Sequence, residues 1–371
     1  MAWIDVCFSA TGVLDFPILF GVHTVIMNTL RWIRAFLFFA LAAIAPALCA
    51  QAAQSQPEFI QPGAVWLDTQ GHQIQAHGGG VLYHDHVWYW FGEDRTQGLD
   101  PDKRYVACYS SRDLIHWTFR GRPLQLADPD RIGSGWVLER PKVFYSRSTR
   151  QFVMYFHLDD SAYKVARVAT AISSTPTGPY RYVRSFRPLG LESRDIGQFE
   201  DDDGSDYLIF ESRPSGGFYI AELSSDRLSV ARQVAFLDLA LEGGAVVHYR
   251  DLYYVLGSHL TGWNPNPNVY SSAPSLTGPW TQFLPVAPAV PDTYGAQSGL
   301  LLKITGDRNT AVIFMGDIWN PSKLWDSRYL WMPVQVGEGK MALPPPAPWT
   351  IDVTTGVVTV NPKEQIAKIT K

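Results

Sequence analysis

Trp88-Tyr89-Trp90-Phe91-Gly92-Glu93 is the stretch that decides the fold, because runs of this kind recur along the chain. The later runs, VMYFHL, YLIFES, YYVLGS and VIFMGD, start at residues 153, 207, 253 and 312, so that neighbouring starts are 65, 54, 46 and 59 residues apart. Each run is six residues long and rich in aromatic and β-branched residues, which is typical of a strand and not of a helix. The chain therefore contains five copies of one strand-based unit.

Most of these runs are followed by a second short strand that ends in a Ser-Ser pair, as in Tyr109-Ser110-Ser111. A repeat of this length with several antiparallel strands and no helical period is typical of a β-propeller blade. The sequence therefore predicts an all-β, five-bladed β-propeller, with residues 53–70 and 345–371 left to close the ring. A β-sandwich is the alternative, but its strands would not show this repeat.

Composition narrows the class of partner. The 371 residues carry a net charge of −4, with 18% charged and 13% aromatic residues. Such a chain has no basic field for a nucleic acid or an anionic membrane surface, and too few charges for a disordered tail. We expect a globular protein that binds no nucleic acid.

The N-terminal segment has the pattern of a secretory signal. Arg31 and Arg34 precede the apolar run 35–48, and the small-residue site Ala50-Gln51-Ala52 follows it. A transmembrane anchor is the alternative, but this run is shorter than the roughly 20 residues a span needs. Met27 is the expected true start. We therefore expect residues 1–52 to be an over-extended start plus signal peptide, and 53–371 to be one secreted or periplasmic propeller domain.

Only one cysteine, Cys108, remains in that mature domain, so no internal disulfide is expected. It lies in the apolar stretch Tyr105–Tyr109, which predicts a buried strand position and not a catalytic thiol.

A polar residue opens another apolar strand 11 to 15 residues ahead of each recurring run: His77, Glu139, Asp195, Glu242 and Gln297. The innermost strands of a propeller line its axis, so these five side chains are expected to converge on one axial pocket. For any one of them alone, a strand-end residue that caps a turn is the favoured interpretation. Together, three carboxylates in one pocket are the equipment of glycoside hydrolysis.

Metal chemistry is not expected at these motifs. His77, His248 and His259 lie near them without ligand spacing. The Asp201-Asp202-Asp203-Gly204 stretch lacks the spaced ligands of a calcium loop and predicts a β-turn between strands. No cofactor is expected, and the sequence leaves a bound structural calcium open.

With these motifs in place, the chain resembles glycoside hydrolase family 43, whose members are five-bladed propellers, and within it the exo-β-1,3-galactanase branch. The resemblance runs from about residue 58 to 335. The motifs that carry it are Ala76–Gly80, Trp90–Glu93, Glu139–Val143, Ser193–Ile209, Ser258–Asn268 and Gln297. The stretch Arg213–Gly217 departs from that branch, which has an asparagine there.

The resemblance implies a role for each site residue. Glu242 would be the general acid, and Asp195 would orient it and hold its pKa up. A glutamine at the position of Gln297 would stand in for the missing general base as its imidic-acid tautomer, or position the attacking water. The implied substrate-binding residues are Glu93, Glu139, Tyr163, Thr261 and His77, the last at the position where other family members carry the base.

The implied function is a secreted, exo-acting hydrolase that releases galactose from the non-reducing end of β-1,3-galactan with inversion. The expected partner is this oligo- or polysaccharide, with no membrane contact after signal removal, and we expect a monomer. Inversion predicts that the Glu242 carboxyl and the Gln297 amide face each other about 6.5–9.5 Å apart. The alternatives are a related arabinosidase or xylosidase, and a non-catalytic carbohydrate-binding propeller.

Overall fold

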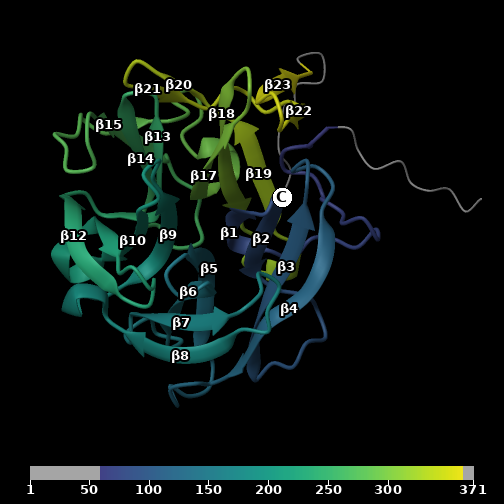
Figure 1. Cartoon of the computed structure of the whole chain (residues 1–371), viewed down its shortest axis with the longest axis vertical. Helices are drawn as coiled ribbons and strands as arrows, with labels where there is room; N and C mark the ends of the chain where they lie inside the picture. The colour runs from purple at the N-terminus through teal and green to yellow at the C-terminus, as the bar shows by residue number, and fades with distance from the viewer. Residues whose placement is uncertain (1–58, 362–371) are drawn as a thin grey trace, which may run out of the picture. The chain divides into compact units, whose positions relative to one another are not determined.

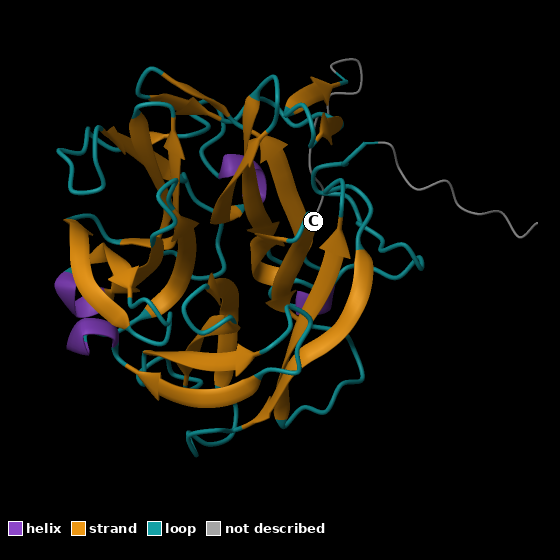
Figure 2. Ribbon diagram, in the orientation of Figure 1, coloured by secondary structure: helices purple, strands orange, loops and turns teal. Residues whose placement is uncertain are grey.

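A computed structural model of the chain describes residues 59–361, and almost all of its regular structure is antiparallel β-sheet (Figure 1). The expected start and signal segment, 1–52, lies outside the described residues. Four sheets of four strands and one of three strands form five blades, which confirms the predicted all-β five-bladed propeller (Figure 2).

The blades follow the order of the chain, and within each blade the strands pair in sequence order. Blade 1 contains β1 (His77–His84), β2 (Val87–Glu93), β3 (Lys103–Ser111) and β4 (Thr118–Ala127). Blade 2 contains β5 (Val137–Ser146), β6 (Gln151–Asp159), β7 (Arg167–Ser173) and β8 (Arg181–Phe186). Blade 3 contains β9 (Arg194–Glu200), β10 (Asp206–Ser212), β11 (Gly217–Leu223) and β12 (Val230–Leu237). Blade 4 contains β13 (Leu241–Tyr249), β14 (Leu252–His259), β15 (Val269–Ala273) and β16 (Leu284–Pro285). Blade 5 contains β17 (Gln297–Thr305), β18 (Thr310–Ile318) and β19 (Arg328–Pro333).

Two small hairpins and four single 3₁₀ turns complete the described regular structure. The hairpins are β20 (Gln335–Gly337) with β21 (Lys340–Ala342), and β22 (Trp349–Asp352) with β23 (Val357–Val360). The turns are η1 (Pro188–Gly190), η2 (Arg213–Ser215), η3 (Thr293–Gly295) and η4 (Leu324–Asp326). In residues 59–361 no helix has the length and apolarity to cross a membrane.

The recurring runs form the second strand of every blade. WYWFGE lies in β2, and its four counterparts lie in β6, β10, β14 and β18. Both faces of these strands are buried, because successive side chains point to opposite sides and a blade is covered by a neighbour on each side. In β10, for example, Leu208 and Phe210 pack toward blade 2, whereas Ile209 packs toward blade 4.

The core is therefore divided into five apolar layers, one between each pair of adjacent blades. Close to the axis these layers are thin, and the backbones of the inner strands nearly touch. A Cβ atom on Gly197 of β9 would lie 1.9 Å from the carbonyl oxygen of Gly244 in β13. Glycine at this position lets two inner strands approach each other closely.

An aromatic seam closes the ring between blades 5 and 1. It contains six tryptophans, Trp66, Trp88, Trp90, Trp117, Trp331 and Trp349. Ile60 near the start of the described chain pairs with Trp349 near its end, and the Trp349 indole donates to the Trp331 carbonyl at 2.8 Å. The described parts of the two segments left over by the repeats thus meet in this seam.

Two local predictions are also confirmed. Cys108 is a free, buried thiol in β3. The stretch after Asp201 forms a tight turn between β9 and β10, in which the amide of Gly204 donates to the carbonyl of Asp201 at 2.9 Å.

Candidate active site

Every inner strand begins with a bulge that carries one residue more than its partner strand. In blade 1 the pairing steps from His77 with Glu93 to Gly80 with Phe91, and the inner strands of the other blades show the same extra residue. The second residue of the bulge has a positive φ in four blades: 57° at Gly78, 52° at Arg140, 33° at Asp195 and 61° at Gly243. Bulges re-aim side chains, and here they turn them toward the axis.

The bulges show that one of the five polar residues was matched wrongly between the repeats. The residues at the first bulge position are His77, Glu139, Arg194, Glu242 and Gln297. Asp195 is therefore the counterpart of Arg140 and not of Glu139, so the assumption that it is equivalent to the other four was wrong by one residue. Asp195 still reaches the axis, because both of the first two bulge residues can face it.

The bulge residues surround a pocket of about 240 Å³. Its wall includes Glu93, Glu139, Arg140, Tyr163, Asp195, Arg213, Glu242, Gly262, Trp263, Gln297 and Trp319. Six of the eight predicted site residues are among them. The two others, His77 and Thr261, lie outside this wall.

Glu242 is one of the buried carboxyls of the pocket, with 6% of its surface exposed. Burial, together with the negative charge of Asp195, raises its pKa to about 8, although Arg140 opposes the shift. Glu242 therefore carries its proton at neutral pH, which is the state that a general acid needs.

Gln297 is held by three hydrogen bonds. Its amide nitrogen donates to Oε1 of Glu242 at 2.9 Å. Its amide oxygen accepts from the indole of Trp319 at 2.9 Å and from the Arg140 guanidinium. The expected separation of about 6.5–9.5 Å between Glu242 and Gln297 is therefore wrong for the unliganded site, because the two side chains are in direct contact.

Arg140 links the blades across the axis. Its guanidinium pairs with Asp195 of blade 3 at 3.0 Å and donates to the Ser298 carbonyl of blade 5 at 3.0 Å, as well as to Gln297. The side chain is 3% exposed to solvent. One buried cation thus fixes both the carboxylate beside the acid and the amide opposite it.

Two further carboxylates form the wall on the side of blades 1 and 2. Glu93 accepts from the backbone amide of Arg140 at 3.0 Å and pairs with Arg95, and burial outweighs that cation and raises its pKa. Glu139 accepts from the Tyr163 hydroxyl at 2.8 Å. Burial opposes its ionisation, but His157, Arg95 and Tyr163 outweigh burial and lower its pKa.

His77 and Thr261 do not reach the pocket wall. His77 is completely buried, with Nδ1 at 3.2 Å from Asp317 and the ring stacked on Tyr329. Thr261 turns its hydroxyl to the carbonyl of Asn264 and the amide of Asn266, which shapes the loop that presents Trp263. Neither side chain belongs to the wall of this pocket, and their contact with a sugar stays a prediction.

Trp319, Arg213 and Arg95 were not predicted as site residues. These side chains stand two residues beyond Asp317, Glu211 and Glu93, which are the residues paired with the first bulge position. Arg95 and Trp319 lie two residues beyond the end of their recurring run and Arg213 lies one residue beyond its run, so the positions just after each run were the signal available in the sequence. Among residues 59–361, two groups of carboxylates and histidine are spaced closely enough for a metal ion: Glu139, His157 and Asp195 beside the pocket, and Asp201, Asp202 and His248.

A five-bladed propeller whose axial pocket gathers carboxylates around one protonated glutamic acid has the equipment of a glycosidase. Residues 81–295 match the family described as Glycosyl hydrolases family 43, which is more than half of the 371 residues. The chain belongs to this family, and it is a glycoside hydrolase.

Solved structures agree with this assignment. The exo-β-1,3-galactanase of Phanerochaete chrysosporium, solved with galactose, is 38% identical with a TM-score of 0.76, over 82% of this chain and 70% of that one. The exo-β-1,3-galactanase of Clostridium thermocellum is 32% identical with a TM-score of 0.75, over 82% and 69%. A putative exo-β-1,3-galactanase of Bifidobacterium bifidum s17 is 33% identical with a TM-score of 0.72, over 77% and 96%.

A curated relative, the β-D-galactofuranosidase of Aspergillus niger, is 26% identical over 201 residues. The match covers 48% of this chain and 56% of that protein, so the chain spans a little over half the length of this relative.

Proposed function

We propose that this family 43 hydrolase is exo-acting and releases galactose from the non-reducing end of β-1,3-galactan, the backbone of arabinogalactan, with inversion. The observation that carries the proposal is the protonated Glu242 at the end of an axial pocket, in a chain 38% identical to an exo-β-1,3-galactanase solved with galactose. A variant of that galactanase has also been solved with β-1,3-galactotriose.

The residues of the pocket suit an acid-catalysed cleavage. Glu242 donates its proton to the glycosidic oxygen, and the negative charge of Asp195 keeps that proton in place until the sugar binds. Arg140 holds Asp195 at 3.0 Å and so fixes the pair. A pocket of about 240 Å³ is smaller than a site for a drug-sized ligand, which favours one terminal sugar and hence exo action.

Inversion requires a water on the face of the sugar opposite the leaving group. The contact between Glu242 and Gln297 leaves no room for it, so the incoming sugar ring has to separate these side chains. Gln297 then faces the anomeric carbon from the far side, where its amide orients the water.

The test is product analysis on β-1,3-galactobiose and on debranched arabinogalactan. The expected product is galactose alone, released first as the α-anomer by NMR. Oligosaccharide products would contradict exo action, and a β-anomer would contradict inversion. Faster cleavage of arabinosides, xylosides or galactofuranosides would reassign the substrate, and a chain that binds galactan without cleaving it would be a binding propeller.

Glu242→Gln tests the acid role. General acid catalysis contributes about 100- to 10,000-fold, so we expect a loss of that size on galactan while binding survives. An aryl galactoside with a good leaving group needs less protonation and should lose less. Equal losses on both substrates would contradict the role of Glu242 as the acid.

We further propose that the enzyme is exported to the periplasm or beyond as a monomer that does not contact the membrane. The support is the signal pattern at Arg31, Arg34 and Ala50-Gln51-Ala52. N-terminal sequencing of the mature protein should give a start near Ala53. An intact chain in the cytoplasm would contradict export, and a dimer in sedimentation would contradict the monomer.

A further inference from the structure

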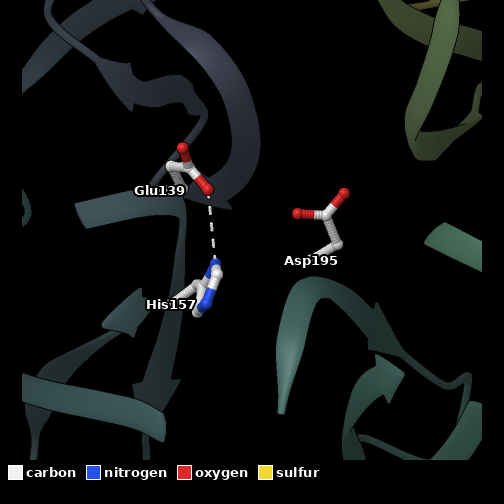
Figure 3. A group of neighbouring side chains, drawn as sticks. All are labelled: Glu139, His157 and Asp195. Atoms are coloured by element: carbon white, nitrogen blue, oxygen red, sulfur yellow. Dashed lines mark ion pairs between the residues drawn. The ribbon is translucent and has the colours of Figure 1, made fainter. Parts of the chain in front are cut away.

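Two side chains that line the pocket form a cluster with a third, fully buried one that has no role in the reaction as proposed. Glu139 of β5, His157 of β6 and Asp195 of β9 each offer one ligand atom, and these atoms all lie within 4.8 Å of one another. Figure 3 shows Glu139 and His157 side by side, with the Asp195 carboxylate facing them. The sequence predicted that Glu139 and Asp195 meet on the axis, but it did not place His157, which lies on the second strand of its blade, beside them.

His157 is placed as a metal ligand would be. The side chain is completely buried, and its Nε2 lies 2.8 Å from Oδ2 of Asp159. Asp159 is itself fixed by the backbone amides of Val165 and Ala166 at 2.8 and 3.0 Å. A carboxylate at Nε2 keeps a proton on that nitrogen and turns Nδ1 toward the other two side chains. Burial opposes a charge on His157, but Asp159 and Glu139 outweigh burial and raise its pKa to about 9, so Nδ1 also carries a proton at neutral pH.

The Nδ1 atom has no hydrogen-bond partner among the described residues. Its nearest acidic atom is Oε2 of Glu139, at 3.4 Å. A buried nitrogen aimed at two carboxylates, and oriented from behind by a third, is the carboxylate–histidine–metal arrangement of zinc proteins.

We propose that Glu139, His157 and Asp195 form a binding site for a divalent transition metal of the zinc class, and that a metal bound there blocks the sugar pocket. One imidazole nitrogen with two carboxylate oxygens suits Zn²⁺, whereas Ca²⁺ and Mg²⁺ prefer oxygen ligands alone. In tetrahedral coordination, zinc bonds of about 2.0–2.2 Å place ligand atoms about 3.3–3.6 Å apart, so atoms that lie within 4.8 Å of one another complete the site by approaching each other by at most about 1.5 Å. The metal takes the place of a proton on Nδ1.

The blocking effect follows from the position of the ligands. Glu139 and Asp195 both line the pocket, so a metal that binds them removes two groups from the sugar. Arg140 engages Oδ2 of Asp195, which leaves Oδ1 for the metal. This second half of the proposal rests on the proposed function, whereas metal binding itself does not.

The other cluster, Asp201, Asp202 and His248, is a matched contrast. Both clusters pair with a cation, here the Lys303 ammonium with Asp202, but this one is open to water, with 59% of the Asp202 side chain exposed. The Tyr253 hydroxyl donates to Asp201 at 2.8 Å, and the His248 side chain is 21% exposed. No metal binding is expected there, which makes His248→Gln a control.

The experiment is calorimetric titration of the chelator-treated full chain with Zn²⁺ alone. One saturable site is expected, and X-ray absorption of the complex should show a single imidazole ligand. His157→Gln and Asp195→Asn should each weaken binding at least about 100-fold, and Asp159→Asn about 10- to 100-fold. His248→Gln should bind as the wild type does. Thermal unfolding of each variant checks that it folds. If His157→Gln does not fold, because His157 is buried, then the zinc affinity of Asp195→Asn tests the site.

Galactose then tests the blocking effect. Saturating galactose should weaken Zn²⁺ binding at least tenfold, and Zn²⁺ should raise KM without lowering kcat. Absence of zinc binding, or binding unchanged by His157→Gln and Asp195→Asn, would overturn the site. Binding that galactose and every other tested sugar leave unchanged would overturn the blocking effect. Competition by arabinose or xylose but not galactose would support the site and contradict the galactanase function.

Discussion

Glu242 keeps its proton at a cost to stability. A glutamate in an unfolded chain releases its proton near pH 4.5, whereas the folded Glu242 retains it until about pH 8. Between these values the folded state holds one proton more than the unfolded state, so this group makes stability fall as pH rises. Catalytic readiness and stability therefore oppose each other at this residue.

Glu242→Gln should accordingly gain stability relative to the wild type as pH rises from 5 to 8, and the difference should level off above about pH 8. The charged groups that face Glu242 are Asp195, Arg140, Glu211 and Arg213, and all four remain in the variant. Urea unfolding of both proteins at three pH values measures the difference. A difference that stays constant with pH would show that Glu242 ionises normally.

The hydrogen bonds of Gln297 bear on its role in the reaction. Its oxygen accepts from both Trp319 and Arg140, and its nitrogen donates to Glu242, which is the pattern of an ordinary amide. An amide held in this way suits the role in which Gln297 positions the water.

Gln297→Ala should reduce kcat by more than tenfold with little change in the free energy of unfolding, because only a pocket group is lost. Trp319→Phe, which removes one hydrogen bond to the same oxygen, should cause a smaller loss. If the alanine variant keeps more than about a tenth of wild-type activity, another residue activates the water, and Glu139 becomes the next candidate.

At the level of the strands, the sequence predicted most of what is local. Alternating aromatic and β-branched residues identify β2 and its counterparts, because a strand buried on both faces needs them. The bulges were missed, since a positive φ at Arg140 or Asp195 leaves no mark in residue type. The one-residue misalignment of Asp195 has this origin.

Contacts across the axis could not be predicted from local sequence patterns either. Arg140 and Gln297 are 157 residues apart, and nothing in either motif indicates that they meet. The burial of His77 is a similar case. Its place in the repeat predicted an axial side chain, but its partners Asp317 and Tyr329 belong to the last blade.

The bulge of blade 4 can be tested directly. A Cβ atom on Gly243 would adopt φ +61° and lie 2.5 Å from the carbonyl oxygen of Ser298. Gly243→Ala should therefore cost about 1–3 kcal/mol of stability and also lower kcat, because the shift displaces Glu242. Gly71→Ala is the control: its φ is +83°, and its Cβ would meet no described atom within 4 Å. Equal effects of the two variants on activity would mean that the bulge does not position the acid.

For the whole molecule, ring closure depends on packing alone. Within residues 59–361 the only cysteine is a buried free thiol, so no disulfide fastens the seam between blades 5 and 1. Because residues 53–70 and 345–371 lie outside the repeats, the sequence predicted that they close the ring. The number of strands in blade 5 was not predicted.

Trp349→Ala should therefore lower the free energy of unfolding by about 3–5 kcal/mol, as expected for a large buried aromatic side chain. The folded fraction should retain its kcat, since Trp349 is absent from the pocket wall. Trp263→Ala is the converse control, because Trp263 is exposed and lines the pocket. It should change KM and leave the unfolding midpoint in place.

The pairing of Ile60 with Trp349 brings the beginning and end of the described chain into one seam, with a hydrogen bond of 2.7 Å between their backbones. In such a ring the choice of first blade is arbitrary. A circular permutant that joins these ends and opens the chain at the turn η1, far in sequence from Glu242 and Gln297, has the same blade-to-blade neighbours as the natural chain. The permuted chain would start with blade 3 and end with blade 2, so the same pocket residues would occur in a different order along the sequence. The present seam between blades 5 and 1 would become an internal connection of the chain.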